Sequence, residues 1–183
     1  MADHADRLLV CRLENELHAR GCGRITALHS PALRRWAEAE FAAGAKKLYF
    51  DFSACEYIDS TLVGSLLRLH TLGKTSDGCF LALVAPSASC VSILDHMRIL
   101  RIIEVVPPRP VPSDAAWMEL DAAPHADRCG FSRTVVDAHE ALGEVEGPLR
   151  DRFRAVACSV KRELEADEAK TKSEPVASVS DSA

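Results

Sequence analysis

One junction, within residues 47–69, most constrains what this chain can fold into. Apolar side chains alternate with polar ones over 48–52, which predicts a buried strand. Leucines then recur at helical spacing over about 61–72, directly after the pair Asp59-Ser60. The sequence therefore predicts strand, loop and helix in close succession. Ser60 is expected at the helix N-terminus, where backbone N–H groups and the helix dipole favour an anion.

The same alternation of elements continues on both sides of this junction. Hydrophobic periodicity predicts strands over 7–13, 24–27, 80–85 and 101–106, and helices over about 30–44 and 89–98. Strands and helices that alternate with short connections indicate an α/β fold. We expect a mixed, largely parallel sheet with right-handed crossovers and flanking helices.

Composition divides the chain into four parts. The elements above assign a domain to residues 1–106, and the sequence PPRPVP over 107–112 reads as a stiff linker. Two amphipathic stripes separated by Gly147-Pro148 predict a helical hairpin within an extension over 113–164. Residues 165–183 are rich in Glu, Lys, Ser and Ala and are expected to be a disordered acidic tail.

Charge and hydropathy exclude several classes of partner. The net charge of −5 is concentrated after residue 164, so a basic patch for nucleic acid is not expected. No stretch of about 20 apolar residues is present, so no membrane span is predicted. The first residues have no secretory signal pattern, which favours a cytoplasmic location.

Cofactor and catalytic motifs are not evident either. The seven cysteines are scattered without a C-x-x-C pair, which fits free thiols in a reducing compartment and argues against a metal site. No phosphate-binding loop or G-x-S-x-G motif is found. Asp137, His139 and Glu140 fall in an amphipathic pattern, where we expect them on the solvated face. The sequence therefore predicts no cofactor, no catalytic residue and no enzymatic activity.

The local chemistry of Asp59-Ser60-Thr61 leaves two interpretations open. Each of these residues could simply cap the following helix, which contributes about 1 kcal/mol. Alternatively, the Ser60 hydroxyl could carry a phosphoryl group, which adds roughly −1.5 to −2 charges at pH 7. Placed beside Asp59, that charge could abolish the docking of a partner without unfolding the protein.

Resemblance to a family extends over most of the first domain. Residues 23–33, the strand sequence LYFDFS over 48–53 and the motif YIDSTLVGSL over 57–66 resemble a STAS domain of the bacterial anti-sigma factor antagonists. In that family the serine directly after the aspartate is phosphorylated by a partner kinase, and Ser60 matches it. Many members have a small residue two places later, whereas this chain has Leu62.

The resemblance implies a function and a set of partners. The unphosphorylated protein would bind a cognate anti-sigma factor or serine kinase, phosphorylation at Ser60 would release it, and a phosphatase would reset the switch. Thr61 would be a second possible acceptor. The partner-binding residues implied are Asp51, Ser53, Asp59, Ser60, Thr61, Leu62 and Gly64. A different function also fits the sequence: a constitutive scaffold or sensory module that binds a ligand or partner without phosphorylation, with Ser60 only as a helix cap.

Overall fold

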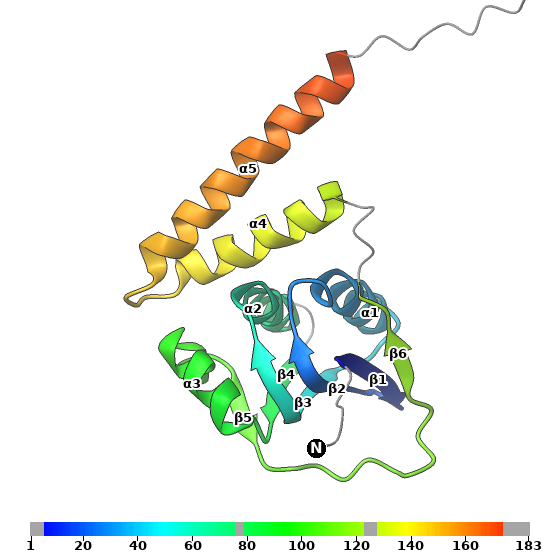
Figure 1. The fold of residues 1–183 in the computed structure, drawn as a ribbon. Helices are drawn as coiled ribbons and strands as arrows, with labels where there is room; N and C mark the ends of the chain where they lie inside the picture. Colours follow the sequence, from blue (N-terminus) through cyan, green and yellow to red (C-terminus); the bar gives the residue numbers. More distant parts are fainter. Residues whose placement is uncertain (1–5, 76–78, 123–127, 174–183) are drawn as a thin grey trace, which may run out of the picture.

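The fold is a six-stranded mixed sheet with helices layered on one face (Figure 1). The computed structural model describes residues 6–75, 79–122 and 128–173. The strands, in the spatial order β5-β4-β3-β2-β1-β6, are β1 (Arg7–Leu13), β2 (Glu16–Ile25), β3 (Lys47–Ile58), β4 (Phe80–Val84), β5 (Glu104–Val106) and β6 (Met118–Leu120). β2 to β5 are parallel, and β1 is antiparallel to both β2 and β6. The predicted α/β class and largely parallel sheet are confirmed.

The helices form successive layers above the sheet. They are α1 (Ser30–Ala42), α2 (Ser60–Thr75), α3 (Ala88–His96), α4 (Arg128–Glu144) and α5 (Arg150–Ser173), with a 3₁₀ turn over Ile99–Arg101. Figure 1 shows α1 and α2 next to the sheet, α4 above them and α5 outermost. The core lies between the sheet and α2, where the rings of Phe50 and Phe52 stack with centroids 4.3 Å apart. The helix α2 is therefore covered on two sides, by the sheet and by α4.

The segment predicted as a linker crosses the opposite face of the sheet. It connects β5 at one edge to β6 at the other (Figure 1). The guanidinium of Arg109 lies 4.1 Å from the ring centroid of Tyr49 on β3 and forms an ion pair with Glu16 at 3.3 Å. Further along, Trp117 stacks under Arg20 of β2 at 4.9 Å. Residues 107–117 thus pack on the sheet instead of separating two units.

Several element boundaries differ from the sequence prediction. The second strand begins at Glu16 rather than near residue 24, because a tight turn with a positive φ of 55° at Glu14 lets it pair with β1 at once. The strand β3 continues to Ile58, and β6 was not predicted. The helix α5 continues to Ser173, so the disorder expected from residue 165 is wrong for residues 165–173. An ion pair of 2.7 Å between Arg133 and Glu168 joins that part of α5 to α4.

Three of the buried histidines are expected to make the fold sensitive to acid. His18, His29 and His70 are at most 9% exposed, and burial lowers the pKa of each below its ordinary value near 6.5. The unfolded chain then binds more protons than the native protein, so stability is full above the unfolded pKa and is lost as the pH falls. We expect the free energy of unfolding, from urea titrations, to fall between pH 7.5 and 5.

A variant pair tests this origin of the acid sensitivity. His70→Leu removes one of the buried titrating groups and should give a shallower decline with falling pH. His96→Gln, at an exposed position on α3, is the matched control and should keep the wild-type slope. An unchanged slope in His70→Leu would contradict the assignment for that side chain.

Candidate functional site

The site is built on the connection between β3 and α2, which is held by Asp59. β3 ends at Ile58 and α2 begins at Ser60, so Asp59 is the residue between them. Its Oδ1 accepts a hydrogen bond from the Leu62 N–H at 2.9 Å, and its Oδ2 accepts from the Ala27 N–H at 2.7 Å. One carboxylate therefore caps α2 and joins the helix to the loop that follows β2. Both oxygens of Asp59 are engaged in fixing the position of Ser60.

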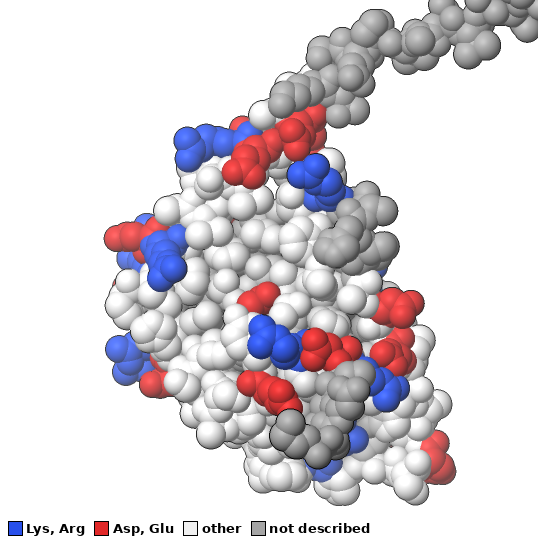
Figure 2. Space-filling view, viewed as in Figure 1, with Lys and Arg blue, Asp and Glu red and all other residues white. Residues whose placement is uncertain are grey.

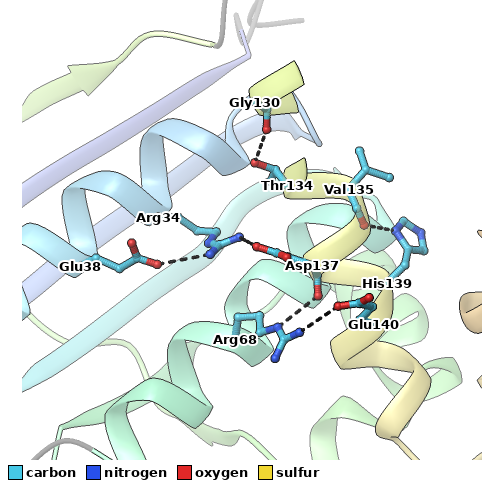
Figure 3. Close-up of polar contacts among 9 residues, drawn as sticks. All are labelled: Arg34, Glu38, Arg68, Gly130, Thr134, Val135, Asp137, His139 and Glu140. Atoms are coloured by element: carbon cyan, nitrogen blue, oxygen red, sulfur yellow. Dashed lines mark hydrogen bonds and ion pairs between the residues drawn. The ribbon is translucent and has the colours of Figure 1, made fainter. Parts of the chain in front are cut away.

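The hydroxyl of Ser60 contacts a histidine from the helical hairpin. Ser60 Oγ lies 3.0 Å from Nε2 of His139 on α4. The other ring nitrogen, Nδ1, lies 2.8 Å from the carbonyl oxygen of Val135 (Figure 3). Because a carbonyl only accepts, Nδ1 carries a hydrogen and donates it, and in the neutral ring Nε2 is then an acceptor. With the ring neutral, the Ser60 hydroxyl donates to His139.

The position of His139 corrects the sequence prediction. It was expected on the solvated face of its helix, but it is 5% exposed and its ring packs against Phe153 of α5 with centroids 5.9 Å apart. Val136 and Leu142 lie three residues before and after it, so His139 belongs to the buried stripe of α4. That spacing was the signal in the sequence that could have identified it.

Charged contacts fasten α4 to both helices beneath it. Arg34 of α1 forms an ion pair with Asp137 at 3.1 Å (Figure 3). Arg68 of α2 donates from Nε to the carbonyl oxygen of Asp137 at 3.1 Å and lies 3.6 Å from the Glu140 carboxylate. Asp137 and Glu140, expected on a solvated face, are half-buried and make these contacts between helices.

The closest approach of α4 to α2 occurs at Gly64. A Cβ atom at this position would lie 2.3 Å from the backbone oxygen of Ala138, so only glycine allows the two helices to come this close. Thr61 and Leu62, on the same helix, are 5% and 0% exposed. Thr61, Leu62 and Gly64 are therefore buried, and their role in binding a partner stays a prediction. For Gly64 it requires α4 to move.

Asp51 and Ser53 lie apart from Ser60. Asp51 Oδ2 accepts from Arg20 Nε at 3.0 Å, and Oδ1 accepts from the Ser53 N–H at 2.9 Å. Asp51 faces the side of the sheet that carries residues 107–117, together with Trp117. The structure thus brings Asp59 and Ser60 together but places Asp51 in a separate polar cluster.

A groove opens next to Ser60. It has a volume of about 510 Å³ and is bounded by the start of α2, by α3 and by α5. Its apolar wall consists of Tyr57, Ile58, Ile93, Met97, Leu149, Phe153 and Val156. Its charged and titratable lining includes His96, His139 and Arg152, with Asp59 as the acidic member. The Ser60 hydroxyl therefore lies in the wall of a largely apolar groove with a basic side.

The Ser60–His139 pair has chemical meaning beyond packing. A neutral imidazole that accepts a hydroxyl proton can assist that oxygen as a nucleophile. The N–H groups of Leu62 and Val63, at the start of α2, already bond to Asp59 and so are not available to an oxyanion. A non-enzymatic role stays our prediction.

Other classes of site have little support in the described part of the chain. No group of three or more His, Cys, Asp or Glu side chains there could hold a metal ion. None of the helices described is both long enough and apolar enough to span a membrane. On the face shown in Figure 2, acidic and basic side chains are interspersed around a broad uncharged area.

Comparisons with known proteins agree with this architecture. The structure of the anti-sigma factor antagonist SpoIIAA in its unphosphorylated form is similar to the chain with a TM-score of 0.51 and 14% identity, over 56% of this chain and 88% of that one. An anti-sigma factor antagonist from Mycobacterium paratuberculosis gives a TM-score of 0.49 and 20% identity, over 58% and 90% of the two chains. A search of curated proteins gives no match.

The family itself is shown by a sequence model rather than by these distant structures. The model of the STAS domain matches residues 5–114, more than half of the chain. The match includes β1 to β5 and the Ser60 junction and ends before β6, α4 and α5. The chain therefore belongs to the STAS domain family and carries, beyond the matched region, a helical hairpin that covers α2.

Proposed function

We propose that this protein is an anti-sigma factor antagonist whose partner binding is switched by phosphorylation of Ser60. In the unphosphorylated state it binds a cognate anti-sigma factor or serine kinase. After phosphorylation, a phosphatase restores the unphosphorylated state. The observation that supports this most is the position of the Ser60 hydroxyl, at the start of α2 and in the wall of an open groove. The proposal places the protein in the bacterial cytoplasm, as a regulator of transcription.

Ser60 is a better acceptor for a phosphoryl group than its neighbour. Thr61 is 5% exposed, whereas Ser60 is half-buried and lines the groove. A phosphoryl group at Ser60 would add roughly −1.5 to −2 charges at pH 7 to a helix N-terminus. Such a change is local and needs no rearrangement of the sheet.

A second function is favoured by the groove and by the hairpin. The apolar wall beside Ser60 could hold a ligand or an apolar segment of a partner without any phosphorylation. In that case the protein is a constitutive scaffold or sensory module. The Ser60 hydroxyl then serves only to bond His139.

Substitutions at Ser60 distinguish the two functions. Wild-type protein, Ser60→Ala, Ser60→Asp and Ser92→Asp serve as parallel baits in native lysate, with captured proteins identified by mass spectrometry. We expect an anti-sigma factor or serine kinase on wild type and Ser60→Ala, and its loss with Ser60→Asp. Ser92→Asp adds the same charge to the groove from α3 and is the matched control, which should keep the partner. The purified partner and ATP should then phosphorylate the wild-type chain at Ser60.

Identical captures on all four baits would contradict the switch and leave the constitutive scaffold. Phosphate mapped to another residue would contradict Ser60 as the acceptor. The two results are independent, because the first concerns binding and the second concerns the site of modification.

A further inference from the structure

We propose that the α4–α5 hairpin binds phosphorylated Ser60 within the same chain and is thereby held closed over α2. The phosphoryl group would enter the groove beside Ser60 and contact His139, His96 and Arg152. This inference rests on the proposed phosphorylation of Ser60 and specifies how that modification is sensed. It assigns a function to the part of the chain that lies beyond the match to the family.

The first step of the argument is the change in hydrogen bonding at Ser60. A kinase transfers the γ-phosphoryl group of ATP to Oγ; an O–P bond forms at Ser60, the bond to ADP breaks, and the hydroxyl proton leaves. Oγ then has no hydrogen to donate to Nε2 of His139, which is 3.0 Å away. A proton on Nε2 restores the contact, because the imidazolium donates to a phosphoryl oxygen while Nδ1 still donates to Val135.

The second step concerns space and charge. The groove of about 510 Å³ has Ser60 in its lining, so a phosphoryl group on Oγ has space to extend into it. Basic side chains reach it from three helices: His96 from α3, His139 from α4 and Arg152 from α5. The acidic group in its lining is Asp59, whose two oxygens already accept from backbone N–H groups. The charges around the groove therefore favour a dianion bound to the hairpin.

The third step is the consequence for α2. When the hairpin is closed, α4 covers Gly64 and contacts Arg68. A partner that requires this face of α2 must displace α4. Phosphorylation that strengthens the hairpin contact therefore withdraws the face from the partner. This differs from the mechanism expected from the sequence, in which the phosphoryl charge and Asp59 repel a partner directly.

The test uses full-length protein with phosphoserine incorporated at position 60 during translation, so that no kinase is required. Hydrogen–deuterium exchange with mass spectrometry compares the amides of α4 in the phosphorylated and unmodified chains. We expect exchange in α4 to slow by about tenfold or more, the order of effect of one hydrogen bond to a charged group. Exchange in β3 and β4 should not change.

Variants identify the origin of the effect. In the phosphorylated chain, Arg152→Gln should lose most of the slowing, whereas Arg162→Gln, an exposed arginine elsewhere on α5, is the matched control and should retain it. Unchanged or faster exchange of α4 in the phosphorylated protein would overturn the proposal, as would equal slowing in Arg152→Gln. Since the phosphoserine is supplied genetically, these outcomes are separate from whether a cellular kinase modifies Ser60.

Discussion

Gly64→Ala is expected to separate α4 from α2 and to lower the free energy of unfolding by about 3 kcal/mol, at the upper end of the cost of overpacking. On an isolated helix the same change would stabilise by about 1 kcal/mol, because alanine is the better helix former. Here the added Cβ would lie 2.3 Å from the Ala138 oxygen and 2.8 Å from its Cα. These are backbone atoms, so a whole helix must shift rather than one side chain. The sign of the effect is thus reversed by the contact with α4.

Two measurements test the Gly64→Ala variant. Chemical denaturation gives the loss of stability, and hydrogen–deuterium exchange shows whether α4 becomes exposed while β2 to β4 stay protected. Ser65→Ala is the matched control, since it puts alanine at the next position of α2 and removes a buried hydroxyl that has no hydrogen-bond partner among the residues described. It should be neutral or slightly stabilising. A Gly64→Ala protein as stable as Ser65→Ala would show that the hairpin is not held closely at this point.

The opened variant is also informative for function. The Ser60 baits identify a partner. If α4 competes with that partner for α2, the Gly64→Ala protein should bind the partner more tightly than the wild-type protein does. Its Ser60 would have lost the contact with His139, because that contact depends on the position of α4. Weaker binding by an otherwise folded Gly64→Ala protein would instead indicate that the hairpin is part of the partner-binding surface.

The fold was predictable from the sequence because its signals are local. The alternation over residues 48–52 and the leucine spacing after Ser60 each need only a few neighbouring residues to be recognised. Short connections then leave few topologies for the sheet. One strand that was missed lies at an edge of the sheet. β6 pairs with β1 through only three residues, and its position depends on 107–117 crossing the sheet, which no local pattern encodes.

The site was predictable in part, for the same reason. Asp59 and Ser60 follow from their place between a strand and a helix. His139 does not, because it lies 79 residues from Ser60 and reaches it only when α4 packs on α2. The spacing of His139 to Val136 and Leu142 indicates a buried position, but it does not indicate which residue the ring contacts. The role of Gly64 could not be predicted for the same reason, since its close approach to Ala138 depends on the same packing.

The buried contacts of α4 also suggest how a local modification could have a wide effect. Ser60, Gly64 and Arg68 lie on one side of α2 and all contact α4. A change at Ser60 therefore acts on a surface that extends along the helix. Two arrangements of the hairpin, closed or displaced, would turn a single charge into the exposure or burial of that surface.

Asp59→Ala is expected to lower the free energy of unfolding by about 3 kcal/mol. The loss of a helix cap costs about 1 kcal/mol, and a backbone N–H left without an acceptor costs about 1–3 kcal/mol. Both apply, since Oδ1 accepts from Leu62 and Oδ2 from Ala27. Denaturation of the purified variant by urea would measure the change.

Asp59→Asn is the control that separates geometry from charge. Its carbonyl oxygen can keep one of the two hydrogen bonds, while its NH₂ group faces an N–H donor and cannot accept. We therefore expect Asp59→Asn to have a free energy of unfolding between those of the wild type and Asp59→Ala. Loss of the anchor should also loosen Ser60, which amide exchange at the start of α2 would report. If Asp59→Ala costs less than about 1 kcal/mol, the range of a simple cap, the bond to Ala27 contributes little. The main role of Asp59 would then be contact with a partner rather than stabilisation of the fold.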